Sequence, residues 1–175
     1  MAETHEFVPA FMLSVLAGSA RPSKRISERQ DALRQMKKDS MAELIDMNPF
    51  LNCQINDSAG YAVFSNVRFN LLRPPSGQAY GILTENHNGR DTFMKMGEVD
   101  FGIGASDFRM VMVFHTPKAL AFFNQTGLAF GSQWNNVGEM GPVDVSMIQL
   151  KETGFALRAM IMSANYWKDE ELNQV

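Results

Sequence analysis

The sequence predicts an α+β fold in which a long N-terminal helix precedes a curled, barrel-like antiparallel sheet with one short inserted helix. Three observations lead to this prediction. Apolar residues between positions 21 and 47 recur at spacings near three and four, which is the helical period. After Gly60 the period changes to two, which is typical of strands that bury one face. Turn residues separate these runs without a linker, so the 175 residues are expected to hold a single folded domain.

The N-terminal segment, residues 1–22, is apolar and is open to two interpretations. Residues 7–20 have the length of a signal-peptide core, and residues 16–19 resemble a bacterial lipobox in which serine replaces the acceptor cysteine. Acidic residues stand before this core, where a signal peptide carries basic ones. The second interpretation is an apolar helix packed on the body of the protein. No window reaches the roughly 20 apolar residues of a membrane span, and residues 23–175 are assigned to the single domain.

The long helix is expected to run from Arg21 to Met47. Ser23 is a suitable N-cap after Pro22, and Pro49 ends the helix because the residue before a proline avoids the α region. The first half of this helix carries seven basic and three acidic side chains, although the whole chain has a net charge of −3. This charge predicts either a solvated face or a patch for anionic lipid head groups, each basic residue contributing about 1 kcal/mol there.

Strands are expected at residues 61–67, 79–85, 92–96, 100–104, 108–114, 128–134, 143–150 and 155–163. The pair Asn88-Gly89 predicts a hairpin between the second and third of them. In the strand at 108–114, phenylalanine and methionine alternate with Arg109 and two valines, so the two sets are expected on opposite faces.

A short helix is expected over residues 118–126, between two strands. Thr116 would be its N-cap, Pro117 its first helical residue, and Gly127 its C-terminal stop. Residues 166–175 are expected to be a polar, acidic tail.

The sequence contains no set of residues typical of catalysis, cofactor binding or metal binding. The single cysteine, Cys53, excludes an intrachain disulfide and a multi-cysteine metal site. Residues 102–107 begin like a dinucleotide loop but lack its third glycine and the following helix. His5, His87 and His115 are isolated, and the slightly acidic charge argues against nucleic acid as a partner. We therefore expect no enzyme, no cofactor and no metal.

Several motifs in register resemble the SYLF domain family in its bacterial form, from about Arg29 to the C-terminus. They lie at residues 59–67, 80–83, 92–97, 101–104, 107–109, 127–133, 149–150, 155–157 and 166–173. The resemblance implies a lipid-binding domain. Eukaryotic members of the family bind phosphoinositides and some bind actin, whereas bacterial members are often secreted or lipoprotein-like. Residues 71–78 depart from the glycine-rich stretch of the family, which implies an altered or lost lipid specificity if that stretch helps to form the site.

We therefore predict a non-catalytic domain that contacts anionic phospholipid or phosphoinositide-like head groups at a membrane surface. The candidate lipid-binding residues are Lys24, Arg25, Arg29, Lys37, Arg68, Arg73, Lys95 and Arg109. Residues such as Met112 and Phe114 would line a space for the apolar tails. The expected location is the periplasm or envelope of a bacterium, with the cytoplasm left open because the signal and lipobox are incomplete.

Two other functions stay open. One is an envelope structural or protein-interaction domain without a lipid ligand, with Trp134, the loop at 135–142 and the acidic tail as its contact surface. The other is a hydrolase that uses a carboxylate or His115, for which no second group stands at a recognisable spacing.

Overall fold

The structure, a computed structural model, describes residues 11–67, 78–97, 108–127, 144–150 and 164–174, and for residues 11–23 and 149 it describes the backbone alone. The helices are α1 (Phe11–Met47), α2 (Phe50–Asn56), α3 (Pro117–Thr126) and α5 (Glu170–Asn173). The strands are β1 (Gly60–Ser65), β2 (Ala79–Glu85), β3 (Arg90–Gly97), β4 (Arg109–Phe114), β5 (Val145–Gln149) and β6 (Asn165–Lys168). The predicted α+β class is confirmed. The strands predicted at 100–104, 128–134 and 155–163 lie outside the described residues.

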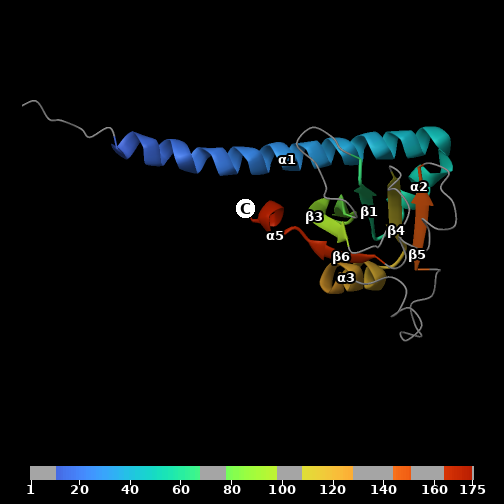
Figure 1. The fold of residues 1–175 in the computed structure, drawn as a ribbon. Coiled ribbons are helices and arrows are strands. Elements are labelled where there is room, and N and C mark those ends of the chain that lie inside the picture. Colours follow the sequence, from blue (N-terminus) through green and yellow to red (C-terminus); the bar gives the residue numbers. More distant parts are fainter. Residues whose placement is uncertain (1–10, 68–77, 98–107, 128–143, 151–163, 175) are drawn as a thin grey trace, which may run out of the picture.

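The elements form three layers, with helices on both faces of the sheet. Figure 1 shows α1 running along one face and α3 lying against the other. α1 contacts β1 and β2 and also contacts the short helices α2 and α5, whereas α3 contacts β1 and β4. Among the described residues, no helix is both long and apolar enough to cross a membrane.

The described sheet has six strands in the order β5-β4-β1-β2-β3-β6, and every neighbouring pair is antiparallel. β1 is central, with Val63 opposite both Ile82 of β2 and Val111 of β4. β5 and β6 are the edges of the described sheet, so these six strands form an open sheet and not a closed barrel. The predicted hairpin between β2 and β3 is confirmed, and Gly89 adopts a φ of 67° in its turn.

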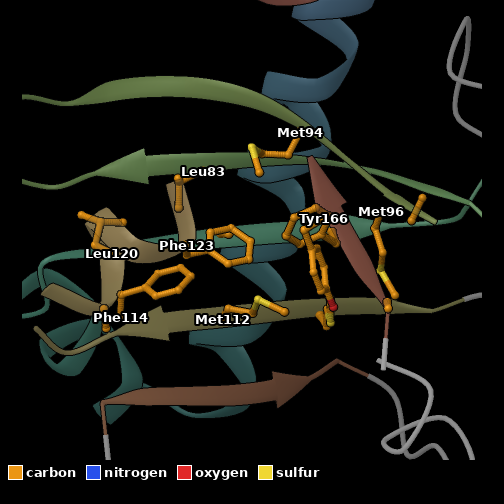
Figure 2. Close-up of a cluster of buried hydrophobic side chains, with 14 of the residues drawn as sticks. Leu83, Met94, Met96, Met112, Phe114, Leu120, Phe123 and Tyr166 are labelled. Atoms are coloured by element: carbon orange, nitrogen blue, oxygen red, sulfur yellow. The ribbon is translucent and has the colours of Figure 1, made fainter. Parts of the chain in front are cut away.

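Because successive side chains of a strand point to opposite faces, the sheet separates two apolar cores. The core under α3 contains Phe64, Met94, Met112 and Phe114 from the sheet, and Phe123 from α3 (Figure 2). The core under α1 contains Val63, Ile82, Val111 and Val113 from the sheet together with Leu33, Leu44, Ile55 and Leu172 from the helices. The predicted division of the β4 side chains between two faces is therefore confirmed.

The short helix α3 has the predicted caps. Thr116 Oγ1 accepts a hydrogen bond from the Ala119 N–H at 3.2 Å, and Pro117 occupies the first turn. Gly127 follows the helix in the left-handed conformation with φ 54°, which a residue with a Cβ rarely adopts. Ala119, Leu120 and Phe123 form its buried face, as their spacing predicts.

Two predictions about helices are corrected. The first helix begins at Phe11 and not at Arg21, so Pro22 and Ser23 lie inside α1 and Ser23 is not its N-cap. A proline removes one backbone donor from a helix, and α1 continues through Pro22 with that single donor missing. The 7-residue helix α2 is unpredicted, because so few residues show no helical period.

The C-terminal residues are not the expected polar tail. They form β6 and α5, and Tyr166 and Leu172 are fully buried. Asp169 begins α5 as its N-cap, with Oδ1 accepting hydrogen bonds from the N–H groups of Glu171 and Leu172 at 3.1 and 3.2 Å. Two of the acidic residues here, Asp169 and Glu171, serve this cap and the ion pairs described below.

Candidate functional site

The predicted lipid-binding residues divide into cations that pair with a distant part of the chain and cations that face solvent. Arg29, Lys37, Lys95 and Arg109 each form an ion pair with an acidic residue of another element or segment. Lys24 and Arg25 are exposed. Arg68 and Arg73 lie outside the described residues.

Arg29 of α1 is bound to the C-terminal segment. Its guanidinium donates to Glu171 Oε2 at 2.6 Å and lies 3.5 Å from Asp169 Oδ2, and it stacks 5.6 Å from the centre of the Tyr80 ring. Burial opposes the charge of Arg29, but the hydrogen bond to Glu171 and the surrounding negative groups outweigh it, so the pKa of Arg29 is raised. Lys95 Nζ reaches the same buried carboxylate, Asp169 Oδ2, at 3.1 Å. These contacts join α1, β3 and α5.

Two further ion pairs fasten α1 to the sheet. Lys37 Nζ donates to both carboxylate oxygens of Asp91 at 2.7 and 2.8 Å and to Thr84 Oγ1 at 3.1 Å. Arg109 donates to Glu43 Oε2 at 2.7 Å. The side chains of Lys37 and Arg109 are only 17% and 26% exposed, and each is paired with a carboxylate, so both cations position the helix on the sheet.

The remaining predicted cations stand at the N-terminal part of α1. Lys24 has 78% of its side chain exposed, with Glu28 Oε1 3.9 Å from its Nζ, and Arg25 is exposed beside it. Figure 1 shows that α1 extends in this direction beyond the sheet and past α5. Its first ten residues, 11–20, have the apolar sequence FMLSVLAGSA, and Arg21 follows them. The helix therefore joins an apolar segment directly to a basic one.

The expected lipid space is not found at Met112 and Phe114. Both side chains have zero exposure, which leaves no room for a water molecule against them. Phe114 packs 4.9 Å from the ring of Phe123, and Tyr166 lies 5.0 Å from Phe64 and 5.4 Å from Phe123 (Figure 2). Side chains of the protein itself fill this part of the core, so the expectation is wrong at these two residues.

An exposed apolar corner lies where α1 ends and α2 begins. Phe50 is 82% exposed and Met47 is 62% exposed, and they lie three residues apart. Asp46 is exposed next to them. Periodicity could not identify this corner, because it lies in the unpredicted turn and helix that follow Met47.

The histidines form no recognisable catalytic set in the described part of the chain. His115 Nε2 lies 2.7 Å from Ser146 Oγ, but both side chains are exposed at the ends of β4 and β5. A nucleophilic serine also needs its histidine oriented by a third group, and no described carboxylate bonds to the other ring nitrogen of His115. The described residues also contain no group of three histidine, cysteine or carboxylate side chains that could hold a metal ion.

The chain is similar to a curated bacterial protein. No family model matches the chain. A curated protein of Aeromonas veronii named "Beta cell expansion factor A" is 25% identical to it over 167 residues, a match that covers 86% of this chain. The chain spans about three-fifths of the length of that relative, since 61% of the relative is matched.

Proposed function

We propose that this chain is a non-catalytic lipid-binding domain that contacts anionic phospholipid surfaces through the N-terminal part of α1. The observation that carries the proposal is a single helix, extending beyond the sheet, in which the apolar residues 11–20 adjoin exposed Lys24 and Arg25. A helix of this kind binds a membrane by burying apolar side chains and by attracting anionic head groups. The resemblance to the SYLF domain family supports the same function.

The internal ion pairs narrow the proposed contact surface. Arg29, Lys37, Lys95 and Arg109 are neutralised by acidic partners, so we do not assign them to the lipid. Each basic residue near an anionic membrane contributes about 1 kcal/mol, so Lys24 and Arg25 together would contribute about 2 kcal/mol. This contribution corresponds to a roughly 30-fold difference in affinity.

Vesicle co-sedimentation tests this proposal. The wild-type chain is expected to bind phosphatidylglycerol-containing vesicles better than pure phosphatidylcholine vesicles, and more weakly as the salt concentration rises. The double substitution Lys24→Gln, Arg25→Gln should weaken binding to the anionic vesicles roughly 30-fold and leave binding to phosphatidylcholine unchanged.

A matched control removes two exposed cations elsewhere, by Arg90→Gln in the β2–β3 hairpin and Lys118→Gln in α3. The control should bind like the wild type. It loses the same two positive charges as the Lys24→Gln, Arg25→Gln variant, but these charges lie away from the proposed contact surface. Equal weakening by both double variants, or no binding of the wild type at low salt, would refute the proposed contact surface.

A protein-interaction function is the second candidate, and the exposed corner of Met47 and Phe50 favours it. An exposed apolar pair beside Asp46 fits a protein partner better than an anionic membrane, because the carboxylate is repelled by the head groups. If this function is the right one, Phe50→Ser will abolish capture of a defined partner without changing vesicle binding. If Phe50→Ser weakens vesicle binding instead, the corner belongs to the lipid surface.

A further inference from the structure

A pocket lies between α3 and the hairpin that joins β2 to β3, away from the proposed lipid surface. Its volume is about 430 Å³, within the range of small-molecule sites in proteins. Pro117, Leu120 and Ala121 of α3 and Ala59 before β1 give it apolar walls. The polar residues at its lining are Glu85, His87, Asn124 and Gln125.

The floor of the pocket is held rigidly. The Ala59 N–H donates to the Phe114 carbonyl at 2.9 Å, and the Ala59 carbonyl accepts from the Asn86 N–H at 3.0 Å. The side chain of Asn86 donates to the carbonyl groups of Ile55 and Ser58 at 2.6 and 3.0 Å. The hairpin is therefore fixed to the segment before β1.

The charged group at the pocket lining is an acceptor, the carboxylate of Glu85. The side chain of Glu85 is only 14% exposed, and its Oε2 accepts from Asn88 Nδ2 at 3.0 Å and lies 3.9 Å from His87 Nδ1. Neither of these neighbours is a permanent cation. Within the described part of the chain, Glu85 has no lysine or arginine partner in an ion pair. The carboxylate thus keeps capacity for a positively charged donor.

Asn124 carries a second acceptor, which a rotation of its amide would bring to the pocket. Its Nδ2 donates to Glu85 Oε1 at 3.4 Å, while its Oδ1 is buried and has no hydrogen-bond partner in the described structure. The carboxylate fixes this orientation of the amide, because the reverse orientation would place two oxygens against each other. An unpaired buried acceptor is unfavourable, and the 3.4 Å hydrogen bond only weakly resists a small rotation of the amide toward a donor.

We propose that this pocket binds a small organic ammonium ion with an apolar body. A protonated primary amine has three N–H donors, enough for the Glu85 carboxylate and Asn124 Oδ1 together, and its alkyl part would lie against Leu120, Ala121 and Pro117. The charge of Glu85 selects ammonium over a neutral alcohol, and the need for N–H donors selects a primary over a quaternary amine.

The test is a titration of the full chain with hexylammonium chloride, followed by amide chemical shifts in two-dimensional NMR. Hexylammonium should shift the resonances of the pocket residues, and both hexanol and hexyltrimethylammonium should bind at least roughly tenfold more weakly. If hexanol or the quaternary ion binds as tightly as hexylammonium, or if hexylammonium shifts no pocket resonance, the proposal is overturned.

Two variants locate the binding. Glu85→Gln removes the charge and should weaken hexylammonium binding roughly tenfold while hexanol is unaffected. Because Glu85 also holds the hairpin, Ala121→Leu provides an independent variant, as it fills the pocket from an exposed helical position and leaves the charge of Glu85 in place. Ala42→Leu, at an exposed position of α1, is its matched control and should bind like the wild type. Equal binding by the Ala121 and Ala42 variants would show that the amine binds elsewhere and would overturn the proposal.

Discussion

Asp169→Asn is expected to destabilise the protein strongly, because the carboxylate of Asp169 is a buried junction of three elements. Its side chain has no exposure, and Oδ2 lies 3.1 Å from Lys95 Nζ and 3.5 Å from an Arg29 guanidinium nitrogen. Removing one member of a buried ion pair costs about 3–5 kcal/mol, since the remaining charge loses its partner. Lys95 and Arg29 keep 28% and 19% side-chain exposure, so water compensates part of the loss.

Asp169→Asn is therefore expected to lower the free energy of unfolding by about 3 kcal/mol. The asparagine oxygen can still accept from the N–H groups of Glu171 and Leu172, so the N-cap of α5 survives. Asp169→Ala removes that cap as well and should cost about 1 kcal/mol more. Urea unfolding followed by circular dichroism measures both losses. Each variant should unfold at a lower midpoint urea concentration than the wild type, with an unchanged dependence of the unfolding free energy on urea.

Glu171→Gln is the control for this prediction. It also removes a negative partner of Arg29, but the Glu171 side chain is 58% exposed, so the expected cost is less than about 1 kcal/mol. The reasoning is refuted if Asp169→Asn unfolds at the same urea concentration as the wild type, or if the Asp169 and Glu171 variants lose equal stability.

Two further predictions concern Tyr166 and Gly127. Burial raises the pKa of Tyr166 well above its usual value, so above about pH 10 the unfolded chain loses the phenol proton while the folded chain keeps it, and stability falls as the pH rises. Urea unfolding at several pH values from about 9 to 11 measures this effect. The free energy of unfolding should fall less steeply with pH for Tyr166→Phe than for the wild type, by up to about 1.4 kcal/mol per pH unit. An equally steep fall in both proteins would contradict burial of the phenol as the cause. Gly127→Ala should destabilise the protein more than Gly89→Ala, because both positions have positive φ but only at Gly127 would the new Cβ meet the backbone of Tyr166. The expected cost is about 1–2 kcal/mol for Gly89→Ala and more for Gly127→Ala, and thermal unfolding of both variants gives the comparison.

The parts of the fold that the sequence predicts correctly are those stabilised by local contacts. Thr116, Pro117 and Gly127 delimit α3, because a cap acts on residues within one helical turn. The β2–β3 hairpin follows from Asn88-Gly89 for the same reason, since the turn and its two strands are contiguous in the chain. The faces of β4 were predictable because strand alternation needs no knowledge of the neighbouring strands.

The candidate site was less predictable, because the partners of its cations are distant in the sequence. Arg29 and Asp169 are 140 residues apart, and Lys37 and Asp91 are 54 residues apart. A count of charges along the first helix predicts a basic patch, but it omits the carboxylates that the sheet and the C-terminal segment bring to the same place. The polar composition of residues 166–175 was misleading for the same reason, since Asp169 and Glu171 have partners on α1 and β3.

The two sets of cations on α1 therefore have separable effects. Arg29 and Lys37 hold the helix to the sheet and to α5, so changes at their acidic partners should alter stability. Lys24 and Arg25 lie on the exposed, N-terminal part of the helix, so their substitution should change lipid affinity and leave the free energy of unfolding within about 0.5 kcal/mol of the wild type. Measuring both quantities for both sets distinguishes a lipid surface from a loss of fold. A Lys24→Gln, Arg25→Gln variant that binds lipid poorly only because it is less stable would remove the reason for assigning these residues to the membrane.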